Sequence, residues 1–285
     1  MRTNDACDSP RRGTSDADES LLLRAGDAQA TLLPGLGGSV ADFTWRGQHV
    51  LRPTPAEAIA ARDVRLAAAY PLVPYSNRIA GARLATGDRV VMLARNFGDH
   101  PHAIHGVGWQ RPWTVARADA ATALLVLSHD PSGSEDAHKA WPWPFVATQS
   151  FALSDCGERA RIAVTITLRN TGDTAFAFGL GWHPYFPVMS STTLQFGATA
   201  VWRNDAAQLP VARTAIAPEL DFSTPRPVIA AARATELDNV YVQWSGSATL
   251  ATPGSAVATS IEADRACGFL VVYSPAGAPF VAIEP

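Results

Sequence analysis

Hydrophobic and polar residues alternate along most of the chain, in short runs separated by residues that favour turns. The clearest run lies within residues 161–170, where every second position is aliphatic: Ile162, Val164, Ile166 and Leu168. Successive side chains of a β-strand point to opposite faces of its sheet, so this period of two predicts a half-buried strand. The next residues, Asn170–Asp173, have the composition of a turn.

The same pattern predicts further strands on both sides of this one. They are Leu21–Arg24, Ala30–Leu33, Ser39–Trp45, His49–Leu51, Asp88–Ala94, Ala123–Ser128, Val146–Leu153, Val240–Trp244 and Phe269–Tyr273. The alanine-rich segment Pro55–Ala69 is the best candidate for a short helix, and Pro131–Lys139 is expected to be a polar loop.

These strands recur with little helix between them, and no linker divides residues 21–285. We therefore expect a single all-β domain built as a large β-sandwich. Residues 1–20 are polar throughout, and we expect them to form a flexible tail outside that domain.

The composition is that of a globular protein, with 47% hydrophobic and 17% charged residues. A net charge of −3 without any Lys/Arg-rich run argues against nucleic-acid binding. No apolar run approaches the roughly 18 residues of a membrane-spanning helix, and residues 1–20 lack the apolar centre of a signal peptide. The cysteines, Cys7, Cys156 and Cys267, are too sparse for a disulfide framework or a zinc site, so we expect reduced thiols in the cytoplasm.

The segment Gly179–Phe186 places His183 among aromatic residues on a stiff backbone. Pro184 fixes its own φ angle and favours an extended conformation for the histidine before it. An imidazole held in this way is suited to act as an acid or a base near neutral pH. A core histidine packed between Trp182 and Tyr185 would give the same pattern.

A proline-stiffened segment earlier in the chain presents Asn77 and Arg78 side by side. Pro71 and Pro74 exclude a regular helix there, so we expect an extended segment or a rigid loop. A solvated arginine on a surface turn is the alternative interpretation.

The next loop contains three histidines, His100, His102 and His105, followed by Trp109. Their spacing differs from the His-x-x-x-His of a zinc-binding helix, and no cysteine or acid lies at a matching offset, so we predict no metal site. Neutral imidazoles beside tryptophans suit an uncharged polyhydroxylated ligand, because its C–H faces stack on rings while its hydroxyls form hydrogen bonds.

Two carboxylates lie beside predicted strands near the C-terminus. Asp238 precedes one strand, and Glu284 follows the apolar run Phe280–Ile283. A glutamate in this position also occurs where a strand simply reaches solvent. A glycoside hydrolase would need two carboxylates facing each other about 5–9.5 Å apart, but that function would leave His183 and His105 without a role.

Four segments together resemble the aldose 1-epimerase (galactose mutarotase) family. They are Pro74–Ile79, His105–Trp109, His183–Phe186 and Ile283–Pro285, in the family's order and at family-like distances. The resemblance implies a β-supersandwich covering almost everything from Leu21 onward. It also implies a cytoplasmic isomerase that interconverts the α and β anomers of a free aldose without a cofactor.

In this resemblance His183 corresponds to the general acid and Glu284 to the general base. The positions that match contacts to the sugar, or adjoin them, are Arg78, His105, Asp238, Asn77, Trp109 and Tyr185. Related enzymes that act on hexose 6-phosphates carry a different segment at positions 74–79, which favours an unphosphorylated aldohexose as the substrate. A non-catalytic sugar-binding protein on the same fold is the alternative.

Members of this family continue beyond the Glu-Pro pair, whereas this chain ends at Pro285. A terminal carboxylate close to Glu284 would add a like charge and raise the pKa of that side chain. Strands at the end of a chain also tend to fray, so we expect residues 280–285 to be weakly held.

Overall fold

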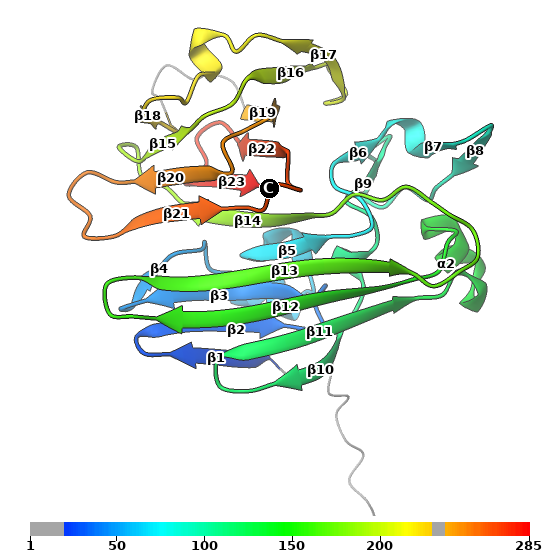
Figure 1. Cartoon of the computed structure of the whole chain (residues 1–285), viewed down its shortest axis with the longest axis horizontal. Helices are drawn as coiled ribbons and strands as arrows, with labels where there is room; N and C mark the ends of the chain where they lie inside the picture. The colour runs from blue at the N-terminus through cyan, green and yellow to red at the C-terminus, as the bar shows by residue number, and fades with distance from the viewer. Residues whose placement is uncertain (1–19, 230–236) are drawn as a thin grey trace, which may run out of the picture.

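The alternating segments form antiparallel strands in the computed structural model, which describes residues 20–229 and 237–285 (Figure 1). In chain order the strands are β1 Leu21–Ala25, β2 Ala28–Leu33, β3 Ser39–Trp45, β4 Gln48–His49, β5 Ala69–Leu72, β6 Arg78–Ile79, β7 Arg83–Thr86, β8 Arg89–Met92, β9 Ala103–Ile104, β10 Thr114–Ala118, β11 Thr122–His129, β12 Phe145–Asp155, β13 Ala160–Asn170, β14 Gly181–Pro187, β15 Thr193–Phe196, β16 Ala200–Asn204, β17 Pro210–Thr214, β18 Arg226–Pro227, β19 Leu237–Val242, β20 Ser247–Ala251, β21 Ala258–Glu262, β22 Phe269–Ser274 and β23 Phe280–Glu284. The predicted tail falls outside the described residues apart from Ser20.

The largest sheet of the described residues has 11 strands, ordered β1-β2-β3-β5-β14-β23-β22-β19-β16-β17 with β4 beside β3. Within the described residues, two four-stranded sheets, β10-β11-β12-β13 and β18-β15-β20-β21, face it. Figure 1 shows β10–β13 lying across β1–β3, and the other four-stranded sheet lying towards the opposite end of the molecule. The predicted all-β sandwich is confirmed, and the extended large sheet makes it a supersandwich.

Burial follows the alternation of the sequence, which explains why these segments form layers. On β12 the inward row is buried, and four of its residues are at most 1% exposed: Phe145, Ala147, Gln149 and Phe151. Gln149 is polar, and its side-chain amide donates to the carbonyl oxygen of Gly38 over 2.7 Å. At the other end of the sandwich, Phe196 of β15 packs edge-on against Tyr241 of β19, with ring centroids 4.7 Å apart.

Of the two predictions about helix content, the first is confirmed and the second was wrong in part. The predicted short helix within Pro55–Ala69 is α1, Ala56–Ala60, and a 3-10 turn, Val64–Leu66, follows it before β5 begins. Arg62 between them has a φ of +55°, which interrupts the helix. The expected polar loop Pro131–Lys139 contains a 3-10 turn, Pro131–Gly133, and most of α2, Glu135–Ala140.

Local capping explains α2. The Ser134 hydroxyl accepts from the backbone N–H of Ala137, and acidic residues in the first turn with basic residues in the last complement the helix dipole. Further 3-10 turns lie at Ala80–Ala82, Gly108–Gln110 and Pro218–Leu220. Among the described residues, no helix has the length and apolar character needed to cross a membrane.

The last strand lies inside the large sheet rather than at a frayed edge. β23 pairs with β14 on one side and with β22 on the other, and Val281–Ile283 are fully buried. The expectation that residues 280–285 are weakly held is therefore wrong, because both sides of the strand make ladder hydrogen bonds. This central position fixes the backbone from which Glu284 projects.

Candidate active site

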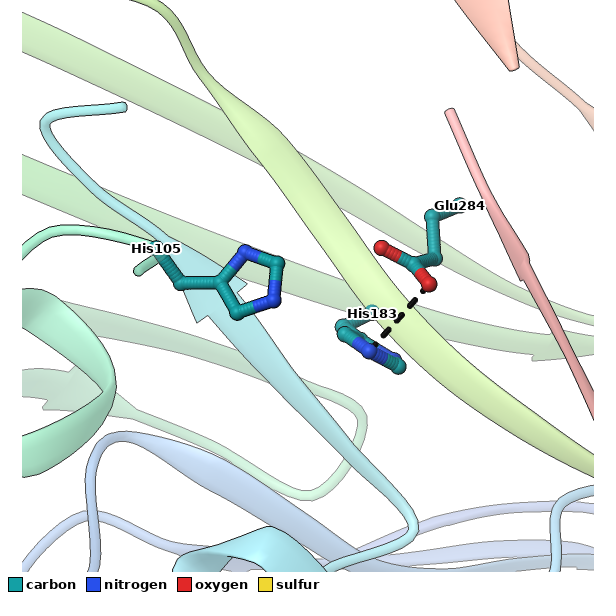
Figure 2. A group of neighbouring side chains, drawn as sticks. All are labelled: His105, His183 and Glu284. Atoms are coloured by element: carbon teal, nitrogen blue, oxygen red, sulfur yellow. Dashed lines mark ion pairs between the residues drawn. The ribbon is translucent and has the colours of Figure 1, made fainter. Parts of the chain in front are cut away.

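His183 and Glu284 meet because their strands are neighbours. The β14–β23 ladder pairs Tyr185 with Ala282 and Phe186 with Val281, and continuing this register places His183 opposite Glu284. His183 Nε2 lies 3.2 Å from Glu284 Oε1 (Figure 2). As predicted, Pro184 follows an extended His183, which is part of β14.

Aromatic rings hold the imidazole in place. On β5, Tyr70 pairs with His183 in the ladder, and its ring centroid lies 4.7 Å from the imidazole. The Tyr185 ring stacks at 4.6 Å, and the hydroxyl oxygens of Tyr70 and Tyr185 are 3.3 Å apart. Behind them the Arg52 guanidinium lies over the Tyr185 ring at 4.1 Å. These contacts restrict the orientation of His183.

Burial governs the protonation of the pair, since His183 is 5% and Glu284 4% exposed. Loss of hydration lowers the pKa of His183 well below its ordinary 6.5, and the positive charge of Arg52 acts in the same direction. Loss of hydration also raises the pKa of Glu284 well above its ordinary 4.5, and the like charge of Asp238 adds to this. Neutral forms are therefore favoured on both sides, and the pair shares one proton.

The rise in the pKa of Glu284 has a different origin from the one that the sequence indicated. Burial is the larger cause, and the neighbouring carboxylate that contributes is Asp238 rather than the end of the chain. The backbone oxygen of Pro285 instead accepts a hydrogen bond from the Trp182 N–H over 3.2 Å. The last residue is thus part of the ladder that carries Glu284.

His105 faces His183, with ring centroids 5.5 Å apart and nearly perpendicular planes (Figure 2). Its Nδ1 accepts a hydrogen bond from the Asn77 backbone N–H over 3.1 Å, and its own backbone N–H donates to the Asn77 carbonyl oxygen over 2.9 Å. Burial, together with the positive charge of Arg78, lowers the pKa of His105 to about 3. His105 is therefore a neutral imidazole with its proton on Nε2, which makes it a hydrogen-bond donor.

The chain bends sharply to bring these groups together. Asn77 and His105 both have left-handed backbone conformations, with φ of +62° and +59°. Gly106 follows with φ +68°, and a side chain there would collide with the backbone of Val73 and Pro74. Residues other than glycine rarely adopt positive φ, and such conformations concentrate at functional sites.

His105, His183 and Glu284 also raise the question of a metal, because one potential ligand atom from each lies within 4.8 Å of the others. A metal needs a lone pair from every ligand. In neutral His105 the Nδ1 lone pair is engaged by the Asn77 N–H and Nε2 carries the proton, so neither nitrogen is available. The donor set does not fit a metal ion. His100 and His102 lie apart from this group, and each accepts a backbone N–H through Nδ1.

Arg78 forms hydrogen bonds with several side chains in a second network. It lies on β6, which pairs with β9, the strand that immediately precedes His105. Its Nη2 donates to Asp238 Oδ2 over 3.0 Å and to Gln208 Oε1 over 2.8 Å, and its Nη1 donates to Asn77 Oδ1 over 3.2 Å. The side chains of Arg78 and Asp238 are 15% and 11% exposed. The alternative of a solvated surface arginine is therefore wrong.

Asp238 lies within β19 rather than ahead of a strand, because that strand begins at Leu237. The side-chain amide of Asn204 donates to the Asp238 carbonyl oxygen over 2.5 Å. Neither Asn204 nor Gln208 belongs to a motif that the sequence singles out. Only their pairing with residues on other strands brings them to the site.

Trp109 and Tyr185, both predicted to contact substrate, lie near His183 and Glu284 in different ways. Tyr185 stacks directly on His183. Trp109 is 3% exposed, packs on Tyr70 at 5.8 Å, and donates its indole N–H to the Gly106 carbonyl oxygen over 3.1 Å. Trp109 thus supports the loop that carries His105, and direct contact between Trp109 and a ligand stays a prediction.

A cavity of about 610 Å³ lies on the Phe97 side of Trp109. The loops that line it contain residues 35–37, 61–65, 96–98 and 109–112. Neither His183 nor Glu284 is among the residues that line this cavity.

Comparisons with known proteins agree with this arrangement. The family model described as Aldose 1-epimerase matches residues 19–285. The uncharacterized protein YphB of Escherichia coli (strain K12) is 29% identical over 243 residues, which are 84% of this chain and 77% of YphB.

Two solved structures extend the comparison. A provisionally assigned aldose 1-epimerase from Escherichia coli K12 superposes with a TM-score of 0.81 at 25% identity, over 94% of this chain and 87% of that one. A galactose 1-epimerase from Lactobacillus acidophilus NCFM superposes with a TM-score of 0.67 at 14% identity, over 93% and 84% of the two chains, and shows the likeness of fold alone.

Proposed function

The chain belongs to the aldose 1-epimerase family, and from this premise we propose that it interconverts the α and β anomers of a free aldohexose. The observation that supports the proposal most is the 3.2 Å contact between His183 Nε2 and Glu284 Oε1. Anomer exchange moves protons on the C1 hydroxyl and on the ring oxygen. Because both oxygens are bonded to C1, an acid and a base in contact with each other can reach both.

In the proposed reaction Glu284 removes the proton from the C1 hydroxyl while His183 protonates the ring oxygen. The bond between C1 and the ring oxygen breaks as the C1 carbonyl forms, which opens the sugar. Rotation about C1–C2 presents the other face of the carbonyl, and the two proton transfers then run in reverse. Each transfer catalysed by a positioned side chain typically contributes about 10²–10⁴-fold.

The shared proton of the free site is compatible with these roles. A neutral imidazole beside a carboxylic acid and an imidazolium beside a carboxylate contain the same number of protons. Passage of that proton from Glu284 to His183 gives the reactive form. Arg78 opposes the rise in the pKa of Glu284, so its charge stabilises the carboxylate in that form.

The remaining polar groups suit an uncharged sugar. His105 offers a neutral donor, and Arg78 stabilises negative charge that develops on a sugar oxygen. The Arg78 guanidinium already has the Asp238 carboxylate 3.0 Å away, so its charge is compensated and a phosphate would meet a neutral pair. We therefore propose an unphosphorylated substrate. Cys156 and Cys267 are free thiols, which supports a cytoplasmic location.

Polarimetry on freshly dissolved α-glucose and α-galactose tests the proposal. The protein should accelerate the approach to the equilibrium rotation, and Glu284→Gln and His183→Ala should each lower the catalysed rate at least ~10²-fold. Glu158→Gln and His138→Ala change exposed residues of the same types and should leave the rate unchanged.

A wild-type rate equal to that of buffer would overturn the enzymatic function. Saturable sugar binding by calorimetry in that case would identify a sugar-binding protein instead. The direct contact between His183 and Glu284 would then serve only to order the binding site.

A further inference from the structure

The loop between β16 and β17, residues 205–209, reaches the network around Arg78. Gln208 Oε1 accepts from Arg78 Nη2 over 2.8 Å, and the same nitrogen donates to Asp238 Oδ2 over 3.0 Å. Gln208 and Arg78 are 130 residues apart in the sequence. The loop therefore adds a polar side chain to one side of the candidate active site.

This loop is built to hold Gln208 in place. The Asp205 carboxylate accepts from the backbone N–H groups of Ala207 over 2.8 Å and Leu209 over 3.0 Å. Asp205 and Leu209 are also joined by a backbone hydrogen bond of 2.9 Å, and the Gln208 N–H donates to the Asp205 carbonyl oxygen over 3.0 Å. Gln208 itself has a φ of +62°, a conformation that glutamine rarely adopts.

Two donors in this network have no hydrogen-bond partner in the described part of the chain. Gln208 Nε2 has no hydrogen-bond partner among residues 20–229 and 237–285, and Arg78 Nε is buried with none in the same part of the chain. Gln208 Oε1 and Asp238 Oδ2 occupy both protons of Arg78 Nη2, which fixes the guanidinium plane. The free Nε–H is therefore held in one direction.

We propose that Gln208 determines sugar specificity by donating from Nε2 to a hydroxyl of the aldohexose, the same hydroxyl that donates to the Asp238 carboxylate. A sugar hydroxyl can accept one hydrogen bond and donate another, so it fits between an amide donor and a carboxylate acceptor. A site built to bind a hydroxyl discriminates against an analogue that lacks it, because its buried polar groups lose their partners. This inference rests on the proposed function and adds a residue that discriminates between substrates.

The test combines Gln208→Leu with a panel of monodeoxy aldohexoses. Leucine has nearly the same size but no amide, so the variant should lose about 5- to 10-fold in kcat/KM with the full sugar, mostly through KM. With the wild type, one deoxy sugar should show a marked loss. With Gln208→Leu that particular loss should shrink by the same factor of about 5 to 10, while the losses for the other deoxy sugars stay unchanged.

Gln243→Leu is the matched control. Gln243 also has a left-handed backbone, with φ +50°, but it is exposed on the turn after β19. Gln243→Leu should leave the loss for every deoxy sugar as it is in the wild type. Gln243→Leu and Gln208→Leu should unfold at similar temperatures. A conservative Gln208→Glu variant keeps an acceptor for Arg78 but removes the amide donor, so it should show the same altered pattern as Gln208→Leu.

An unchanged deoxy-sugar pattern in Gln208→Leu, with kcat lowered equally for every sugar, would overturn the assignment and leave Gln208 as a support for Arg78. Calorimetric binding of the same sugars separates this result from failure of the proposed function. If the wild type binds sugars without catalysis, the binding constants still test the contact. A wild type that neither binds nor converts any aldohexose would overturn the function and the assignment together.

Discussion

Replacing Arg78 by methionine removes the cation from a largely buried ion pair, and we expect this to destabilise the protein. Arg78 Nη2 lies 3.0 Å from Asp238 Oδ2, and the two side chains are 15% and 11% exposed. Methionine has a similar length but no donor, so it leaves the carboxylate desolvated without a counter-charge. Gln208 Oε1 and Asn77 Oδ1 lose a donor as well.

The size of the effect follows from the burial of the pair. Removing one partner of a buried ion pair typically costs about 3–5 kcal/mol. Because the remaining exposure lets water reach Asp238, we expect the lower end, about 3 kcal/mol. At about 2 °C per kcal/mol for a large domain, the unfolding temperature should fall by about 6 °C.

A double-mutant cycle isolates the ion pair from the other losses. With Asp238→Asn already present, no carboxylate is left without its counter-charge, so adding Arg78→Met removes mainly the hydrogen bonds to Gln208 and Asn77 and should cost only about 1 kcal/mol. Urea unfolding followed by tryptophan fluorescence gives the free energy of unfolding of each variant. The difference between the two backgrounds should be about 2 kcal/mol.

The exposed pair of Arg65 and Asp63 provides the control. Arg65 Nη2 lies 2.6 Å from Asp63 Oδ2, but the side chains are 56% and 24% exposed. Arg65→Met should therefore cost less than about 1 kcal/mol. If Arg78→Met costs no more than this, or costs the same in both backgrounds, the pair is solvated and the reasoning about its burial is refuted.

Three further predictions concern His183, Glu284 and the ring of Tyr70 that packs on His183. The plot of kcat/KM against pH should be bell-shaped, because His183 and Glu284 together must hold one proton. The midpoint of its acid limb should lie below pH 6.5, since burial lowers the pKa of His183. The midpoint of its alkaline limb should lie above pH 4.5, since burial raises the pKa of Glu284. An acid limb at or above 6.5 would contradict this. The raised pKa of Glu284 in the folded state means that its stabilising contribution is complete below pH 4.5 and is lost as pH rises. Glu284→Gln should therefore gain stability relative to the wild type as pH rises above 4.5 in urea unfolding. A difference that stays constant with pH would argue against the shift. Tyr70→Phe keeps the ring 4.7 Å from His183 and should retain most activity. Tyr70→Ala removes the ring and should lower the free energy of unfolding by about 3–5 kcal/mol in the same assay. Equal losses in Tyr70→Phe and Tyr70→Ala would show that the hydroxyl, rather than the ring, supports the imidazole.

Local alternation was sufficient to predict the strands whose partners are close in sequence. β12 and β13 form a hairpin in which one face of each strand is more buried, so their period of two is visible in the residues themselves. The helix α2 was also readable in principle, because Ser134 and the charges that follow it are capping signals. Its six residues were too few for a clear helical period.

The candidate site depends on contacts that no local pattern contains. The contact between His183 and Glu284 arises from the register of two strands that are far apart in the chain, and only the family resemblance connected them beforehand. Gln208 was missed because its loop has an ordinary composition and its partner Arg78 is 130 residues away. The direction of each pKa shift was equally hidden, because it depends on burial in the finished fold.

The central claim is that His183 and Glu284 act as one acid–base unit on the sugar. Polarimetric kcat/KM values for His183→Ala, Glu284→Gln and the double variant test it most directly. Because residues that act together are strongly non-additive, the double variant should be little slower than the slower single variant. Losses that multiply would contradict the claim, since each group would then contribute independently of the other.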